Sequence, residues 1–175
     1  MPTSYICNSL NHYNIYNLNK MLQRIQSIYL LFASLVLFGL FLFPLAHNIY
    51  VDGKLVNVTV TGVYETINGQ DSHIQVFTGL TIITVIAALI PLIVIFLYKN
   101  RKQQIALCYS AILVLIGYSF WMAQTVKKVV GDITLEYRNM GIGLFLTSLS
   151  IILIIFAVKS IQRDEKLVKS ADRLR

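Results

Sequence analysis

The sequence predicts an all-α membrane protein: a four-helix transmembrane bundle with a small extracytoplasmic β-hairpin or sheet cap and a cytoplasmic C-terminal helical tail. Hydrophobic residues make up 56% of the 175 residues and charged residues only 13%, against about 45–50% and 25% in soluble domains. The two kinds of residue are also segregated, because four apolar blocks without charge alternate with stretches that carry the charges. This segregation is typical of a chain that is partly surrounded by lipid.

The first twenty residues differ from the rest of the chain. Residues 1–20 are rich in Asn and Tyr and have no apolar periodicity. They also lack the basic start and short apolar core of a signal peptide. We interpret them as a disordered leader or an incorrectly assigned start, with translation beginning at Met21, and expect residues 21–175 to form a single membrane domain.

Four uncharged blocks are each long enough to cross a bilayer, which takes about 20 residues. The predicted spans are 25–45, 77–98, 105–126 and 141–158. Because no charge lies inside them, each is expected to insert unaided. The first block exceeds the apolar core of a cleaved signal, about 7–15 residues, so we expect it to be retained.

The basic residues predict the orientation of the spans, since Lys and Arg accumulate in cytoplasmic loops. Four of them fall in the segments 46–76 and 127–140, which are therefore expected outside. The other eleven precede the first span, join the second to the third, or lie in the tail 159–175. Both termini are therefore predicted to be cytoplasmic.

The outer segments contain signals for β-hairpins. Asp52-Gly53 and Asn68-Gly69 are tight-turn pairs, and each is flanked by stretches rich in β-branched residues. Val56, Val58 and Val60 alternate with polar residues, as in a half-buried strand. In the second outer loop, KKVV and ITLEY flank Gly131-Asp132 and predict another hairpin. We expect a small antiparallel sheet over the bundle, with the two outer loops pairing or lying against the membrane.

Small, hydroxyl and proline residues recur on single helix faces within the spans. Such faces allow close helix approach and hydrogen bonds between helices, so packing is the preferred interpretation and a polar permeation path the alternative. Pro91 is expected to kink its helix. The residues assigned to packing are Thr81, Thr84, Pro91, Gly117, Gly143, Thr147 and Ser150.

Several classes of function have no support in the sequence. The GxSxG, HExxH, Walker and CxxC motifs are absent, and the spans contain no ionisable residue of the kind that pumps use. His47 and His73 share a loop with three carboxylates, but their spacing matches no metal-ligand pattern. The net charge of +7 lies at the ends of the spans, which argues against nucleic-acid binding. We predict no enzymatic activity, metal or cofactor.

The C-terminal segment KSIQRDEKLVKSADRLR continues the fourth span without a helix breaker. Glu165 and Lys169 stand four residues apart in the favourable order. Leu167, Ala171 and Leu174 form an apolar stripe, with Val168 beside it. We expect this helix to lie on anionic lipid or dock on a partner, with a solvated extension as the alternative.

Four stretches carry a family resemblance: MLQRIQSIYLLFA, YKNRKQQIAL, GIGLFL and KSIQRDEKLVKSADRLR. Over residues 21–175 the chain resembles a family of small four-helix inner-membrane proteins from Bacteroidetes, classed as a domain of unknown function. The resemblance implies a bacterial inner (cytoplasmic) membrane and implies no activity. Most of these stretches lie at the cytoplasmic side, where arginines could bind lipid phosphates or pair with carboxylates. The candidate interaction face is Arg24, Arg101, Lys102, Arg163, Asp164, Glu165, Asp172 and Arg173.

These observations favour a non-enzymatic accessory or scaffold subunit of a membrane complex. Its expected partners are membrane lipids and either another protein or further copies of itself. A small oligomeric channel or transporter is the first alternative, and a lipid-binding or lipid-handling protein is the second.

Overall fold

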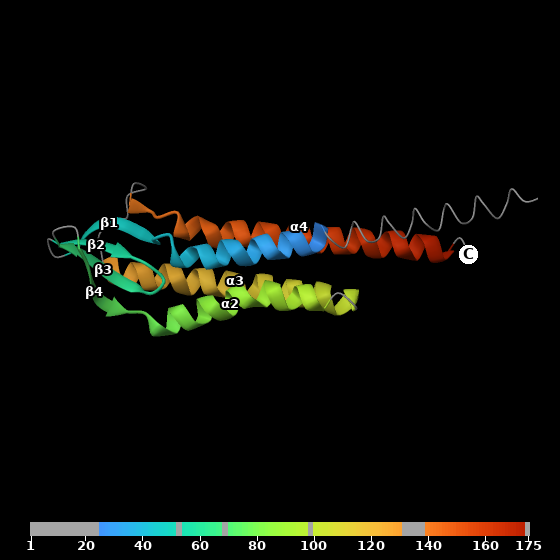
Figure 1. Cartoon of the computed structure of the whole chain (residues 1–175), viewed down its shortest axis with the longest axis horizontal. Helices are drawn as coiled ribbons and strands as arrows, with labels where there is room; N and C mark the ends of the chain where they lie inside the picture. The colour runs from blue at the N-terminus through green and yellow to red at the C-terminus, as the bar shows by residue number, and fades with distance from the viewer. Residues whose placement is uncertain (1–24, 52–53, 68–69, 98–99, 131–138, 174–175) are drawn as a thin grey trace, which may run out of the picture.

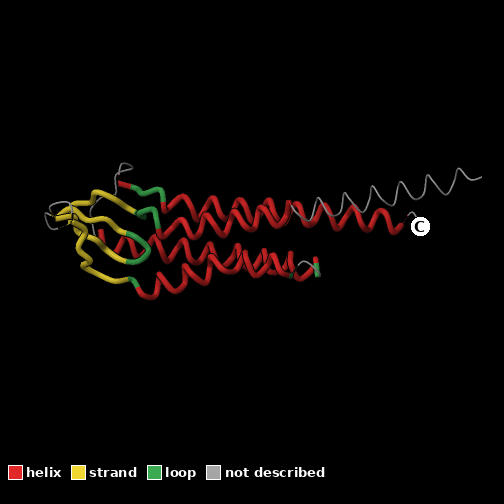
Figure 2. Tube along the Cα trace, viewed as in Figure 1, coloured by secondary structure: helices red, strands yellow, loops and turns green. Residues whose placement is uncertain are grey.

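The computed structural model describes residues 25–51, 54–67, 70–97, 100–130 and 139–173. Within these residues four helices lie side by side, and an antiparallel sheet covers one end of them (Figure 1). The strands gather at one end of the long axis, where the last turns of α3 (Arg101–Val130) lie beside them, and the rest of the described molecule is helical (Figure 2). The predictions for residues 1–20 and Arg24 lie outside the described residues.

The helices follow the predicted spans, with differences at their ends. The described part of the first helix is Ile25–Phe41, and its last turn, η1 (Gly39–Phe41), is a 3-10 turn. The others are α2 (Thr78–Phe96), α3 (Arg101–Val130) and α4 (Gly143–Arg173). By length and composition, α2, α3 and α4 could each cross a membrane, and the first helix is apolar but shorter as described.

Each helix buries a row of residues that are spaced alternately three and four positions apart. This row is called the stripe of the helix. This spacing is the heptad pattern of helices that pack nearly parallel with interlocking side chains. α2 continues through Pro91, which lies on its own stripe. The stripes are Gln26, Leu30, Ala33, Leu37 and Leu40; Leu80, Thr84, Ala87, Pro91 and Val94; Gln104, Cys108, Ala111, Leu115, Tyr118 and Met122; and Thr147, Ser150, Ile154, Ala157, Ile161 and Asp164.

Two helix ends differ from the ends of the predicted spans. The first helix does not reach Leu45, because the chain turns at Pro44 and the Leu45 N–H donates to Val58 O at 2.7 Å. α3 does not stop at residue 126, and the KKVV segment that was expected to be a strand forms its last turn. Val126 and Val130 are 2% and 3% exposed, so burial at the sheet outweighs the strand preference of valine. The rest of that predicted hairpin lies outside the described residues.

The sheet is a meander of four antiparallel strands in the order β1-β2-β3-β4. The strands are β1 (Ala46–Val51), β2 (Lys54–Val58), β3 (Gly62–Ile67) and β4 (Gln70–Val76). Val51 pairs with Lys54 and Ile67 with Gln70, so both hairpins predicted from the turn pairs are confirmed. Val56 and Val58 are buried as expected. Val56 and Val63 line the same pocket as Val129 of α3, so this face of the sheet turns toward the helices.

A short junction ties the first helix to the start of α4. Pro44 O accepts from the Gly143 N–H at 3.1 Å, and Leu45 O accepts from the Gly141 N–H at 2.9 Å. Ala46 also forms a β-bridge with Met140. The predicted pairing of the two outer loops is therefore present at this junction.

Candidate functional site

The end of the bundle opposite the sheet is polar and buried. The stripes of the first helix, α3 and α4 end there in Gln26, Gln104 and Asp164, which are 5%, 3% and 1% exposed. Gln104 Nε2 donates to the carbonyl of Val94, the last member of the α2 stripe, at 3.3 Å. The stripes of the first helix, α3 and α4 therefore each end in a buried polar residue, and these three residues are called the polar layer.

An ion pair crosses this layer. Arg101 Nη2 lies 3.0 Å from Asp164 Oδ2, and the two side chains are 33% and 1% exposed. Arg101 is the first residue of α3, directly after Asn100, whose amide donates to Gln103 Oε1 at 3.0 Å. Since a helix N-terminus carries partial positive charge, a basic first turn is unfavourable there unless an anion compensates it. Asp164 supplies that anion.

Two atoms of the layer have no hydrogen-bond partner among the described residues. They are Asp164 Oδ1, an acceptor, and Gln26 Nε2, a donor. A buried polar atom without a partner costs about 1–3 kcal/mol. The polar layer is therefore the least satisfied part of the described core.

The predicted interaction face is only partly assembled by the fold. Arg101 and Asp164 form a pair, as expected for arginines and carboxylates of this face. Glu165 instead pairs with Lys169 on its own helix, at 2.7 Å. Lys102 and Arg163 are exposed. Arg24 and the side chains of Asp172 and Arg173 lie outside the described part of the chain.

α4 extends beyond this polar layer. Its helix runs on from Asp164 to Arg173, past the start of α3 at Arg101 (Figure 1). The predicted helical continuation of the fourth span is thus confirmed. Leu167 on this extension is 48% exposed. The extension therefore presents apolar and basic side chains outside the packed bundle.

Two hydroxyl residues assigned to packing join helices. Thr84 and Tyr118 link α2 to α3, with their hydroxyl oxygens 2.7 Å apart. Ser150 Oγ donates to Ala33 O on the first helix at 3.3 Å. Because these hydroxyls are engaged in bonds between helices, they fit packing better than a polar permeation path.

The other assigned packing residues have different surroundings. Thr81 Oγ1 lies 3.2 Å from Val60 O, which connects α2 to the turn before β3. Thr147 is buried and donates within its own helix, to Leu144 O. Gly143 packs against the junction, where a Cβ would lie 2.8 Å from Pro44 O. Gly117 is exposed on α3 with open space around it, so it packs against no described helix of this chain.

The buried polar residues that the sequence analysis missed include Gln26, Gln104 and Tyr118. Each occupies a stripe position, and a polar residue in step with an apolar heptad is the signal that could have found them. Among the described residues, no three or more His, Cys, Asp or Glu residues gather where they could hold a metal ion.

The fold and the apolar helices define a small helical-bundle protein with a sheet at one end, compatible with a membrane location. The chain belongs to the family described as a domain of unknown function (DUF4293), whose model matches residues 22–174. This match confirms the resemblance to a family classed as a domain of unknown function. No curated protein and no solved structure matches the chain.

Proposed function

We propose that this protein is a non-enzymatic accessory or scaffold subunit of a bacterial inner-membrane complex. In this proposal four helices span the membrane, both termini are cytoplasmic, and the sheet lies outside. The described positive residues at the polar end, such as Arg101, Lys102 and Arg163, support this orientation because such residues accumulate on the cytoplasmic side.

The observation that carries the proposal is the extension of α4 from Asp164 to Arg173. A helix that leaves its bundle needs another surface for its apolar side chains. Leu167 is 48% exposed, and Lys166 and Lys169 are exposed beside it. The Arg101–Asp164 pair holds the base of this extension against the bundle. The extension is therefore a charged and partly apolar arm suited to docking on a partner subunit.

Site-specific crosslinking tests whether this arm docks on a partner subunit. A photoreactive amino acid placed at Leu167 would be activated in native membranes, with the protein tagged at Met21 so that the C-terminus stays free. The matched control carries the same group at Leu113, which is 74% exposed on α3 and faces outward from the bundle. Mass spectrometry after gentle solubilisation would identify the adducts and their stoichiometry.

We expect the Leu167 probe to crosslink one protein stoichiometrically and the Leu113 probe to give mainly lipid adducts. Truncation after Asp164 should abolish copurification of that protein while the remaining bundle still folds. A Leu167 probe that reacts only with lipid, with no copurifying protein, would refute the scaffold proposal and favour lipid binding by the arm. A partner that survives the truncation would show that the docking surface is not the arm.

A further inference from the structure

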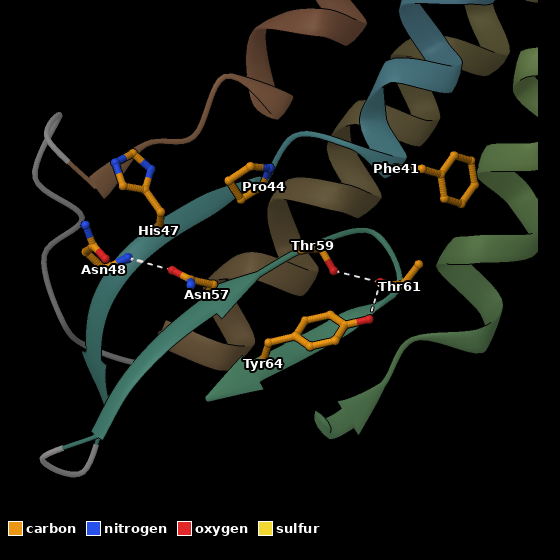
Figure 3. Close-up of a pocket in the computed structure, with 8 residues that line it drawn as sticks. All are labelled: Phe41, Pro44, His47, Asn48, Asn57, Thr59, Thr61 and Tyr64. Atoms are coloured by element: carbon orange, nitrogen blue, oxygen red, sulfur yellow. Dashed lines mark hydrogen bonds between the residues drawn. The ribbon is translucent and has the colours of Figure 1, made fainter. Parts of the chain in front are cut away.

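A pocket of about 420 Å³ lies on the outward face of the sheet, beside the end of the first helix (Figure 3). Asn57, Thr59, Thr61 and Tyr64 form its polar wall, and Phe41 and Pro44 lie toward the helix end. This volume falls within the range of small-molecule sites, about 300–1,000 Å³. The pocket is on the opposite side of the sheet from Val56 and Val63, so it is separate from the packed core.

A bulge in β1 shapes one side of the pocket. Ala46 pairs with Val58 and Ile49 with Val56, so His47 and Asn48 together face the single residue Asn57. Asn48 has a φ of 54°, a conformation that costs most residues about 1–2 kcal/mol. Its backbone N–H donates to Asn57 Oδ1 at 3.0 Å. The bulge therefore brings two successive polar side chains to the pocket, where a regular strand would supply one.

The hydroxyl groups of the wall form a chain with a defined direction. Thr59 Oγ1 donates to Gly62 O at 3.0 Å, which uses its only proton. Thr61 must then donate to Thr59 at 2.8 Å, and Tyr64 must donate to Thr61 at 2.9 Å. The Tyr64 oxygen at the end of the chain is left with acceptor lone pairs only. This wall thus favours a ligand that brings its own hydroxyl or N–H donors.

The remaining surroundings narrow the class of ligand. Among the described residues that line the pocket there is no Asp, Glu, Lys or Arg, so a charged ligand would find no fixed countercharge. The ring of Tyr64 is held by His73, with ring centroids 4.4 Å apart. Aromatic and apolar walls with a few placed polar groups are typical of small-molecule sites.

We propose that this pocket binds a neutral, hydroxyl-rich group such as a sugar ring. The hydroxyls of the ligand donate to Tyr64 and Thr61, and its less polar side packs on Phe41 and Pro44. The group is either a free saccharide or the headgroup of a glycolipid. This site is independent of the α4 arm, because it lies at the other end of the molecule.

The test uses the full chain in phosphatidylcholine nanodiscs, with one probe for a free saccharide and one for a glycolipid headgroup. Maltose is titrated by calorimetry as the free saccharide. Monoglucosyl diacylglycerol is included in the nanodisc as the lipid-linked form, and native mass spectrometry compares its retention with that of diacylglycerol with the same chains. Both probes are applied to the wild type, Tyr64→Phe, Asn48→Gly and the control Tyr50→Phe, whose residue lies on β1 and does not line the pocket.

We expect one of the two probes to bind at one molecule per chain. Tyr64→Phe should weaken it about 2- to 10-fold, as the loss of one hydrogen bond predicts, and Tyr50→Phe should not change it. Glycine adopts a positive φ without strain. Asn48→Gly therefore removes the side-chain amide from the pocket while β1 keeps its conformation. Binding of neither probe, or equal losses in Tyr64→Phe and Tyr50→Phe, would overturn the proposal.

Discussion

The carboxylate of Asp164 and the guanidinium of Arg101 join the last helix to the first turn of α3, with Oδ2 and Nη2 3.0 Å apart. The two partners differ in their surroundings, because Asp164 is 1% exposed and Arg101 is 33% exposed. A charge that loses its partner costs most where water cannot reach it. Removing Arg101 and removing Asp164 should therefore reduce the free energy of unfolding by different amounts.

Arg101→Ala leaves a buried, unpaired carboxylate and should reduce the free energy of unfolding by about 3 kcal/mol. Asp164→Asn leaves an arginine that can reach water and should cost about 1 kcal/mol. Unfolding by sodium dodecyl sulfate in mixed micelles measures both. The control Glu165→Gln breaks a pair whose Lys169 partner is 67% exposed, and it should leave the free energy of unfolding almost unchanged because water screens exposed pairs. If Asp164→Asn costs as much as Arg101→Ala, the pair is not buried as described.

Gly143 is required by close contact with the junction. A Cβ there would lie 2.8 Å from Pro44 O and 2.9 Å from Leu45 Cδ2, so Gly143→Ala should destabilise the protein by about 1–3 kcal/mol. Gly117→Ala is the matched control, because open space surrounds that position. It should be neutral or stabilise α3 by up to about 1 kcal/mol. Equal effects of the two substitutions on unfolding would contradict the packing of the junction.

Removing the two partners of the Thr84–Tyr118 hydrogen bond one at a time should reduce the free energy of unfolding by different amounts. Thr84 Oγ1 donates to Leu80 O at 2.7 Å, so the Tyr118 hydroxyl must donate to Thr84. Tyr118→Phe removes only that bond, and bonds between membrane helices average about 0.6 kcal/mol. Thr84→Val should cost more, because it leaves the Tyr118 hydroxyl without an acceptor. The double variant in a thermodynamic cycle should cost less than the sum of the two single losses, and simple additivity would rule out the bond.

Cysteine labelling tests the proposed orientation. In a Cys7→Ala and Cys108→Ala background, Tyr50→Cys should react with a membrane-impermeant maleimide added to intact spheroplasts. Ser170→Cys on the arm should react only after the membrane is opened. Leu113→Cys, expected to face lipid, should react in neither case. Labelling of Ser170→Cys in intact spheroplasts would reverse the assigned sides.

The candidate site was only partly predictable from the sequence. The charges of Arg101 and Asp164 marked them as a possible pair, because they stand near the cytoplasmic ends of predicted spans. Gln26 and Gln104 carry no charge and match no motif, so their role in the polar layer emerged only when the four stripes were aligned in space. Of the glycines, Gly143 and Gly117 look alike in sequence, and only their neighbours distinguish them.

The sequence by itself determined the elements whose cause is local. The long apolar blocks form helices, which pair their own backbone groups as a membrane span must, and Asp52-Gly53 and Asn68-Gly69 favour tight turns between the paired strands. The tertiary structure decided the features that depend on contacts with other helices and with the sheet. Asp164 is buried although it lies in a charged tail, because Arg101 reaches it from another helix. Lys127 and Lys128 are helical although their segment favours a strand, because Val126 and Val130 pack at the sheet end of α3.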